Sequence, residues 1–386
     1  MRIYFDHNAT SPLHPEVASL VSRLLTEEFG NPSSVHTYGQ RAKAVLDEAR
    51  SAVAALIDAE PGDVVFTSGG TESDNFAIRG AAEAIEPAGR KHLIATAIEH
   101  EAVLTTLKAL ERRGWTSTLL PVGTSGIVEP DALRAALRDD TALVSVMHAN
   151  NEIGTIQPIA ELAAIARERG AMFHTDAVQS AGKIPVSTRA LGVDLLSLSA
   201  HKFNGPKGAG ALWLRRGTRL SATMTGGKQE RNRRAGTENV PVLAGLGLAA
   251  SIAKTRLASP DAIGALRDRL EAGVLAAVAG TAVNGAPDRR VPNTSNISFE
   301  GIEAESLLIA LDLEGIAVST GSACSSGSLE PSHVIKAMGL PQQRGHSSIR
   351  FSLGQGNTDE EVGFLLEKLP SLVEKLRSLT RRVRRV

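Results

Sequence analysis

Five short apolar runs in the first 200 residues each end abruptly on polar or glycine residues. They cover residues 63–69, 93–98, 142–147, 171–175 and 194–198, and helical patterns separate them. Apolar strands that alternate with helices are typical of a mostly parallel sheet with helices packed on its faces. After the last run, the turn-rich residues 204–210 lead into the apolar residues 211–214, which predicts a hairpin.

The pattern changes near residue 255, where we place a domain boundary. Beyond it we expect a helix over 261–278, a strand over 294–299 and helices over 304–314 and 359–379. A chain of 386 residues exceeds the usual size of one hydrophobic core. The prediction is therefore an α/β fold with a large domain over 16–255 and a smaller α+β domain over 256–386, joined by residues 1–15.

Composition narrows the class of protein. Lys+Arg and Asp+Glu both number 42, and aromatic residues make up 3% of the chain, which argues against direct nucleic-acid binding and against a membrane-surface protein. The uncharged residues 240–253 are shorter than the roughly 20 apolar residues of a membrane span and predict a buried helix. A single cysteine excludes an intramolecular disulfide and a self-contained cysteine-ligated metal site. We expect a cytoplasmic protein.

Polar side chains follow the predicted strands where each strand ends. In open α/β sheets, ligands bind beyond the carboxyl ends of the strands. Five residues from separate segments fall there: His100, Asn151, Asp176, Gln179 and Lys202. The sequence therefore predicts a ligand site at this edge.

The residue types at that edge suit pyridoxal 5′-phosphate. A buried Asp176 would face the pyridine nitrogen, and a desolvated Lys202 would be a reactive free amine. His100 would lie over the ring and move protons. Gly69-Gly70-Thr71 and the basic loop 226–237 are candidate phosphate sites. Each feature alone has a structural alternative, namely an ordinary helix cap, a solvated loop or a hydrogen-bonded structural side chain.

Two further residues carry candidate chemistry. Cys324 lies among serine and glycine in residues 319–328, which suits an exposed thiol on a loop able to swing. Arg350 lies in a strand-like run and could hold a substrate carboxylate with two hydrogen bonds, or form a surface salt bridge.

With these motifs in place, the chain resembles the cysteine desulfurases of the NifS/IscS type. These belong to the class V aminotransferase branch of the fold-type I (aspartate aminotransferase-like) enzymes. The resemblance rests on residues 4–10, 30–34, 67–75, 150–154, 199–202 and 234–239, and the residues 320–324 resemble the first of the family's two groups. Lys228 and Asn232 depart from it, since many members have glycine there.

The resemblance implies a role for each site residue. Lys202 would carry the cofactor, Asp176 would face the pyridine nitrogen, and His100 would stack on the ring. Gln179 and Asn151 would bind the ring-hydroxyl side. Phosphate would be held by Gly70, Thr71, Ser199 and His201, with Thr237 from the other subunit of a homodimer. The substrate carboxylate would be oriented by Asn31, Asn151 and Arg350.

The implied reaction converts L-cysteine to L-alanine and leaves a persulfide on Cys324. The sulfur would pass to an acceptor such as an iron–sulfur scaffold or a thiolation protein, and Cys324 would be a transient [2Fe-2S] ligand with no stable metal site. Iron–sulfur assembly, tRNA thiolation and DNA phosphorothioation all remain open as pathways. The alternatives are a selenocysteine lyase, another class V aminotransferase, or a non-catalytic protein that keeps the fold.

Overall fold

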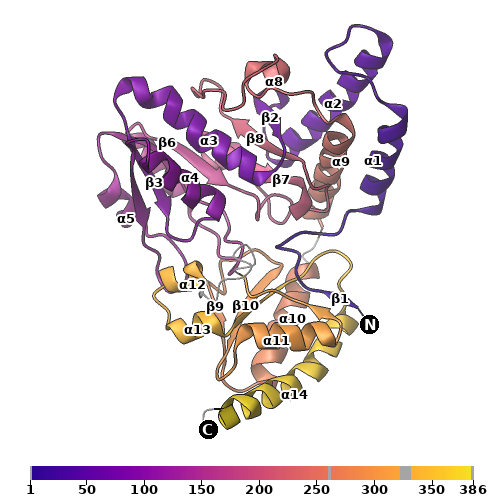
Figure 1. Ribbon diagram of the computed structural model, residues 1–386, viewed down its shortest axis with the longest axis vertical. Coiled ribbons are helices and arrows are strands. Elements are labelled where there is room, and N and C mark those ends of the chain that lie inside the picture. The colour runs from indigo at the N-terminus through magenta and orange to yellow at the C-terminus, as the bar shows by residue number, and fades with distance from the viewer. Residues whose placement is uncertain (1, 260–261, 322–331, 384–386) are drawn as a thin grey trace.

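The computed structural model describes residues 2–259, 262–321 and 332–383, which form two lobes (Figure 1). The larger lobe contains a seven-stranded sheet in the order β2-β8-β7-β6-β5-β3-β4. Strands β3 to β7 pair in parallel, whereas β8 is antiparallel to both β7 and β2. The predicted mostly parallel sheet and its hairpin are confirmed.

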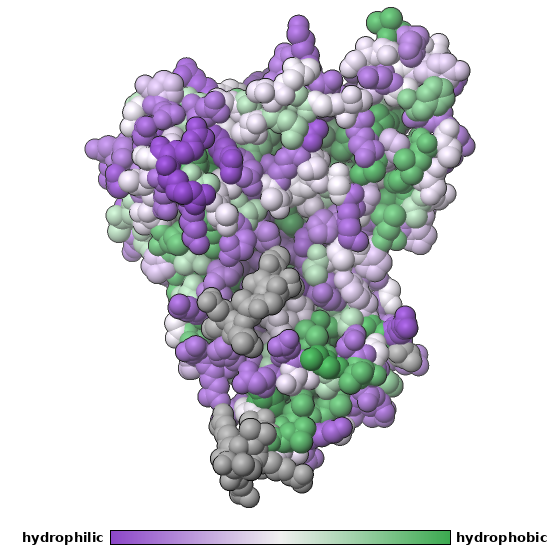
Figure 2. Space-filling model, viewed as in Figure 1, coloured by the Kyte–Doolittle hydropathy of each residue, from purple (hydrophilic) through white to green (hydrophobic). Residues whose placement is uncertain are grey.

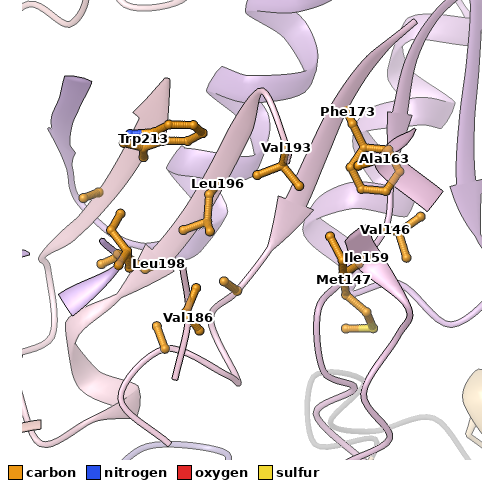
Figure 3. Close-up of a cluster of buried hydrophobic side chains, with 14 of the residues drawn as sticks. Val146, Met147, Ile159, Ala163, Phe173, Val186, Val193, Leu196, Leu198 and Trp213 are labelled. Carbon is orange, nitrogen blue, oxygen red and sulfur yellow. The ribbon is translucent and has the colours of Figure 1, made fainter. Parts of the chain in front are cut away.

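Most strands coincide with the predicted apolar runs. A strand that is buried on both faces of the sheet has a continuous apolar sequence, and this makes it recognisable. Their bounds are β2 Val64–Thr67, β3 His92–Thr96, β4 Thr116–Leu120, β5 Thr141–Ser145, β6 Met172–Asp176, β7 Leu195–Ser199 and β8 Gly210–Leu214. The edge strand β4 was not predicted, because its sequence Thr-Ser-Thr-Leu-Leu is mostly polar and partly exposed. Figure 3 shows Phe173 of β6 beside Ala163 and Ile159 of α6, with Leu196 and Leu198 on β7 and Trp213 on β8, and all six belong to one buried hydrophobic cluster.

Helices cover the large sheet (Figure 1). They are α1 Pro15–Glu27, α2 Thr37–Leu56, α3 Gly70–Ile85, α4 Glu101–Glu111, α5 Pro130–Ala136, α6 Ile159–Glu168, α7 Thr188–Leu191, α8 Gln229–Asn232 and α9 Val240–Leu257, with short 3₁₀ turns at Pro61–Asp63, Glu86–Ala88 and Ala200–Lys202. Among the described residues, α9 is the one helix long and apolar enough to cross a membrane. Half of it is buried, and it packs against α1 and α2, which accounts for its apolar character.

The smaller lobe is built on the antiparallel sheet β12-β10-β9. Its elements are α10 Ala262–Ala277, β9 Thr281–Asn284, β10 Thr294–Phe299, α11 Ala304–Leu313, β11 Ile316–Ala317, α12 His333–Ala337, α13 Gln342–His346, β12 Ser348–Ser352 and α14 Asp359–Val383. The N-terminal strand β1 (Ile3–Tyr4) pairs with β11. Ile3 and Phe5 are buried in the same cluster as Phe299 and Phe351, so the chain starts in the small lobe before it enters the large one.

A buried ion pair anchors a loop with unusual backbone angles. Glu230, Arg231 and Asn232 have φ values of 45°, 57° and 64°, a left-handed conformation that costs energy for most side chains. Both Glu230 oxygens accept hydrogen bonds of 2.7 Å from Arg50, and one also accepts from the Phe66 N–H. These bonds hold the loop against β2.

We expect Glu230→Gln to destabilise the protein strongly, because it leaves the Arg50 charge buried without a counter-charge. The expected loss is about 3 kcal/mol in the free energy of unfolding, measured by urea denaturation. Asp47→Asn removes the exposed pair with Lys43 and should cost no more than about 0.5 kcal/mol. Equal effects of the two substitutions would contradict an anchoring role for Glu230.

Candidate active site

Five strands end at the same edge of the large sheet. Strands β3, β5, β6 and β7 are parallel, and β2 runs in the same direction because two antiparallel pairings separate it from β7. Asp176 is the last residue of β6, and the segments that follow the other four strands carry Gly70, His100, Asn151 and Lys202. The sheet therefore presents the predicted residues on one side.

Asp176 lies at the centre of this edge. It is buried at the end of β6, and its Oδ1 accepts a 2.8 Å hydrogen bond from the Val178 N–H. Burial raises the pKa of Asp176, while this hydrogen bond and the positive charges of His100 and Lys202 lower it. His100, Asp176 and Lys202 thus stand at the ends of β3, β6 and β7, on the same edge of the sheet.

A second buried carboxyl group, which the sequence analysis missed, lies near Asp176. Burial and the charge of Asp176 raise the pKa of Asp74 well above its usual value. Two close carboxyl groups cannot both ionise cheaply out of water, so a charged Asp176 favours a protonated Asp74. Burial also lowers the pKa of His174 to about 3, which leaves this neighbour of Asp74 neutral.

The N-terminal segment crosses the site and holds Lys202. Lys202 Nζ donates to the carbonyl oxygens of Asn8 and Ala9, at 2.6 and 2.8 Å. The neighbouring His201 contacts the Thr10 hydroxyl at 3.2 Å. Burial, with the charges of Lys202, Lys207 and Lys183, lowers the pKa of His201 to about 4, so this imidazole is neutral at pH 7.

The glycine pair before α3 forms a cradle that fits a phosphate. Gly69 adopts a φ of 154°, and α3 begins at Gly70 without a side-chain cap. A Cβ atom at Gly70 would lie 2.8 Å from Val178 Cγ2 and 3.7 Å from Ser199 Cβ. Thr71 is exposed in the first turn. Backbone N–H groups at this helix end, with the Thr71 and Ser199 hydroxyls nearby, suit an anion.

The basic loop 226–237 is tied to the same helix end. Arg234 forms an ion pair of 2.7 Å with Glu72 in the first turn of α3. The two departures from the family pattern fit the backbone: Asn232 has a φ of 64°, which asparagine tolerates better than most residues, and Lys228 has an ordinary φ of −88°. Neither departure disrupts the loop.

Arg350 is buried, so the surface salt bridge considered for it is wrong. Its side chain is 3% exposed and forms a 2.6 Å ion pair with Asp6, while Nη1 donates to the Asn151 carbonyl oxygen at 2.9 Å. Its buried Nε has no hydrogen-bond partner in the described part of the chain. An unsatisfied buried donor of this kind fits a carboxylate ligand.

The structure does not bring every predicted residue to this edge. Asn31 and Thr237 are exposed on loops of the large lobe, and Asn31 Oδ1 accepts from the Ser33 N–H. Cys324 lies outside the described residues. Asp6, Asn8 and Lys183 contact site residues but were not predicted. Asp6 and Asn8 belong to the motif 4–10, and Lys183 lies four residues beyond Gln179 in the sequence, which was the available signal.

We expect Gly70→Ala to weaken binding of pyridoxal 5′-phosphate by about tenfold or more. The added methyl group would press on Val178, whose branched side chain has few alternative rotamers. In the sequence Val178 falls between Asp176 and Gln179, so a shift of its backbone would displace both residues. Binding is measured by titrating apoenzyme with the cofactor. Gly62→Ala, which meets nothing within 4 Å, is the matched control and should bind like wild type. Unchanged affinity for Gly70→Ala would argue against this cradle.

Relatives in sequence extend over nearly the whole chain. Residues 3–365 match the family model of the aminotransferase class-V proteins. A cysteine desulfurase IscS of Dictyoglomus turgidum is 49% identical over 379 residues, which cover 98% of this chain and 96% of the relative. A cysteine desulfurase IscS of Methanosarcina thermophila is 50% identical, with 98% and 93% covered.

Solved structures agree with these relatives. A NifS-like protein superposes with a TM-score of 0.91 and 37% identity, covering 97% of this chain and all of that chain. A NifS-like protein of Rickettsia africae gives a TM-score of 0.87 with 31% identity, over 97% of this chain and all of its own. The fold-type I prediction is thereby confirmed. The chain belongs to the aminotransferase class-V family, among its cysteine desulfurases of the NifS/IscS type.

Proposed function

We propose that this chain takes sulfur from L-cysteine, releases L-alanine and holds the sulfur as a persulfide on Cys324. The observation that carries the proposal is the gathering of His100, Asp176 and Lys202 at one sheet edge, in a chain about half identical to proteins named cysteine desulfurase. Iron–sulfur scaffolds and thiolation proteins are the acceptors we propose.

Pyridoxal 5′-phosphate is the cofactor of the aminotransferase class-V family. When bound, it supplies an electron sink for the charge that develops at the substrate α-carbon. The buried Asp176 suits the pyridine nitrogen, and the α3 start with Ser199 and His201 suits the phosphate. We assign the ring-hydroxyl side to Gln179 and Asn151.

Lys202 provides the amine that binds the cofactor and takes the substrate α-proton. The Nδ1 atom of His100 accepts a 3.1 Å hydrogen bond from the Ala102 N–H, so a neutral His100 carries its proton on Nε2. Nε2 is therefore the atom through which His100 moves a proton. Arg350, oriented by Asp6, binds the substrate carboxylate together with Asn31 and Asn151.

Sulfur transfer requires a second nucleophile. The Cys324 thiolate attacks the substrate sulfur, so that a sulfur–sulfur bond forms as the carbon–sulfur bond breaks. The bonding electrons stay with the substrate carbon, which then takes up a proton. The product is released as L-alanine. The persulfide then goes to an acceptor, and Cys324 can serve as a transient [2Fe-2S] ligand on a scaffold. We place the reaction in the cytoplasm.

A homodimer would complete the site with Thr237 of the partner subunit at the phosphate. Apolar side chains support a dimer contact around the α1–α2 connection that carries Asn31. The exposed large apolar side chains there are Leu25, Phe29, Val35 and Tyr38. Figure 2 shows hydrophobic surface in the region of α1 and α2. Exposed apolar patches of this kind mark interaction surfaces.

Phe29→Asp should shift the protein from dimer to monomer, because it puts a charge into this apolar surface. Sedimentation equilibrium measures the change. Leu313→Asp is the control, since Leu313 is 82% exposed on the small lobe, against 75% for Phe29. A stable dimer in the Phe29 variant would exclude this surface from the interface.

Cys324→Ala should lower sulfur release from L-cysteine by on the order of 100-fold or more, because no other thiol exists in the chain. Wild type should yield equal amounts of alanine and sulfide with a reductant, and the variant should keep the visible band of the bound cofactor. Full sulfur release by the variant would favour a lyase reaction without a persulfide. Keto-acid formation would instead indicate transamination.

A further inference from the structure

Lys183 is a partly buried cation for which the proposed reaction gives no role. Its Nζ lies between two amide oxygens, 2.6 Å from Gln179 Oε1 and 2.7 Å from Asn8 Oδ1. It forms no ion pair with any carboxylate in the described part of the chain. It also borders an interdomain pocket of about 620 Å³, which Lys202 lines as well. Burying a cation without a counter-charge costs free energy, and only its hydrogen bonds to neighbouring groups can offset that cost.

The contacts of Lys183 decide which way two amides face. An ammonium group donates hydrogen bonds and accepts none, so both amide oxygens must point toward it. The Gln179 amide nitrogen then donates to the Asn8 carbonyl oxygen at 2.9 Å, the same oxygen that Lys202 Nζ reaches at 2.6 Å. Lys183 is thus connected to Lys202 through Gln179 and Asn8.

Lys183 also lies among positively charged groups of the site. Burial and the positive charges of Lys202, Arg350 and Arg256 lower the pKa of Lys183 well below its usual value. In turn, the charge of Lys183 helps to lower the pKa of His201 and of His7. These five groups come from four segments, since His201 and Lys202 are adjacent, and each interacts electrostatically with Lys183. A protonated Lys183 therefore influences the region where Lys202 and the phosphate side meet.

We propose that Lys183 is a positioning residue, which fixes the Gln179 amide so that its nitrogen donates toward the ring-hydroxyl side of the cofactor and toward the Lys202 region. The inference rests on the proposed function only for the role of Gln179 toward the cofactor. It predicts that Lys183 controls the protonation of the bound cofactor without touching it.

The test follows the visible absorption band of the holoenzyme as a function of pH. A hydrogen-bond donor at the ring hydroxyl and a nearby positive charge both lower the pKa of the proton that the bound cofactor shares with the Lys202 nitrogen. In Lys183→Met, the pH midpoint of the band should therefore rise by about one unit. The rate constant kcat at neutral pH should fall more than the KM for L-cysteine changes, since substrate contacts remain.

Two controls separate positioning from simple charge. Lys207→Met removes an exposed lysine that also influences His201 but contacts neither amide, and its midpoint should match wild type. Gln179→Leu should raise the midpoint, and adding Lys183→Met to it should change the midpoint little, because the two residues act as one unit. Should Lys183→Met not fold, Lys183→Leu, which also removes the hydrogen-bond donor, carries the same expectation.

The outcomes distinguish the two proposals. A wild-type protein without a cofactor band would overturn the proposed function. A wild-type band with an unchanged midpoint in the Lys183 variants would overturn only the positioning role. A full additional shift from Lys183→Met in the Gln179→Leu background would also overturn it, since Lys183 would then act by charge alone.

Discussion

The hydrogen bonds of Asn8 hold the two lobes and the site together. Its amide nitrogen donates to the Asn151 carbonyl oxygen and to Thr294 Oγ1, and its backbone N–H donates to Ser352 Oγ. Its oxygens accept from Lys183 and Lys202 of the large lobe and from Asn293 of the small one. A buried amide whose hydrogen bonds are all made specifies one arrangement of the two lobes. Any other arrangement would leave buried polar groups without hydrogen-bond partners.

This arrangement explains which parts of the molecule the sequence could predict. Strands such as β6 and β10 were placed within a residue or two, because apolar runs between turns depend on local pattern alone. The edge position of Asp176 and Lys202 followed from the parallel topology. The roles of Asp6, Asn8 and Lys183 were not predictable, since their partners lie up to 344 residues away in the chain.

Burial shifts the pKa values of several titratable groups in and around the site. Asp74 and Glu99 have raised pKa values, with Glu99 at about 8, and His174 and His201 have pKa values lowered to about 3 and 4. At neutral pH these groups are therefore mostly uncharged. Charge at the sheet edge is then concentrated on Asp176, on Lys202 and on the Arg350–Asp6 ion pair, which suits a pyridine ring, a phosphate group and a carboxylate.

Glu152 contacts the residues on either side of the segment that carries Cys324. Its buried carboxylate accepts a hydrogen bond from the Ser332 hydroxyl, and an added Cβ on Gly321 would lie 2.9 Å from the same Oε2 atom. The segment between Gly321 and Ser332 therefore begins and ends beside one carboxylate. Ser319, two residues before Gly321, pairs through its backbone with Arg350. The backbone at the proposed substrate-carboxylate residue thus fixes the position of Ser319, just before Gly321. A substitution that shifts Arg350 would consequently disturb both substrate binding and the origin of the Cys324 segment.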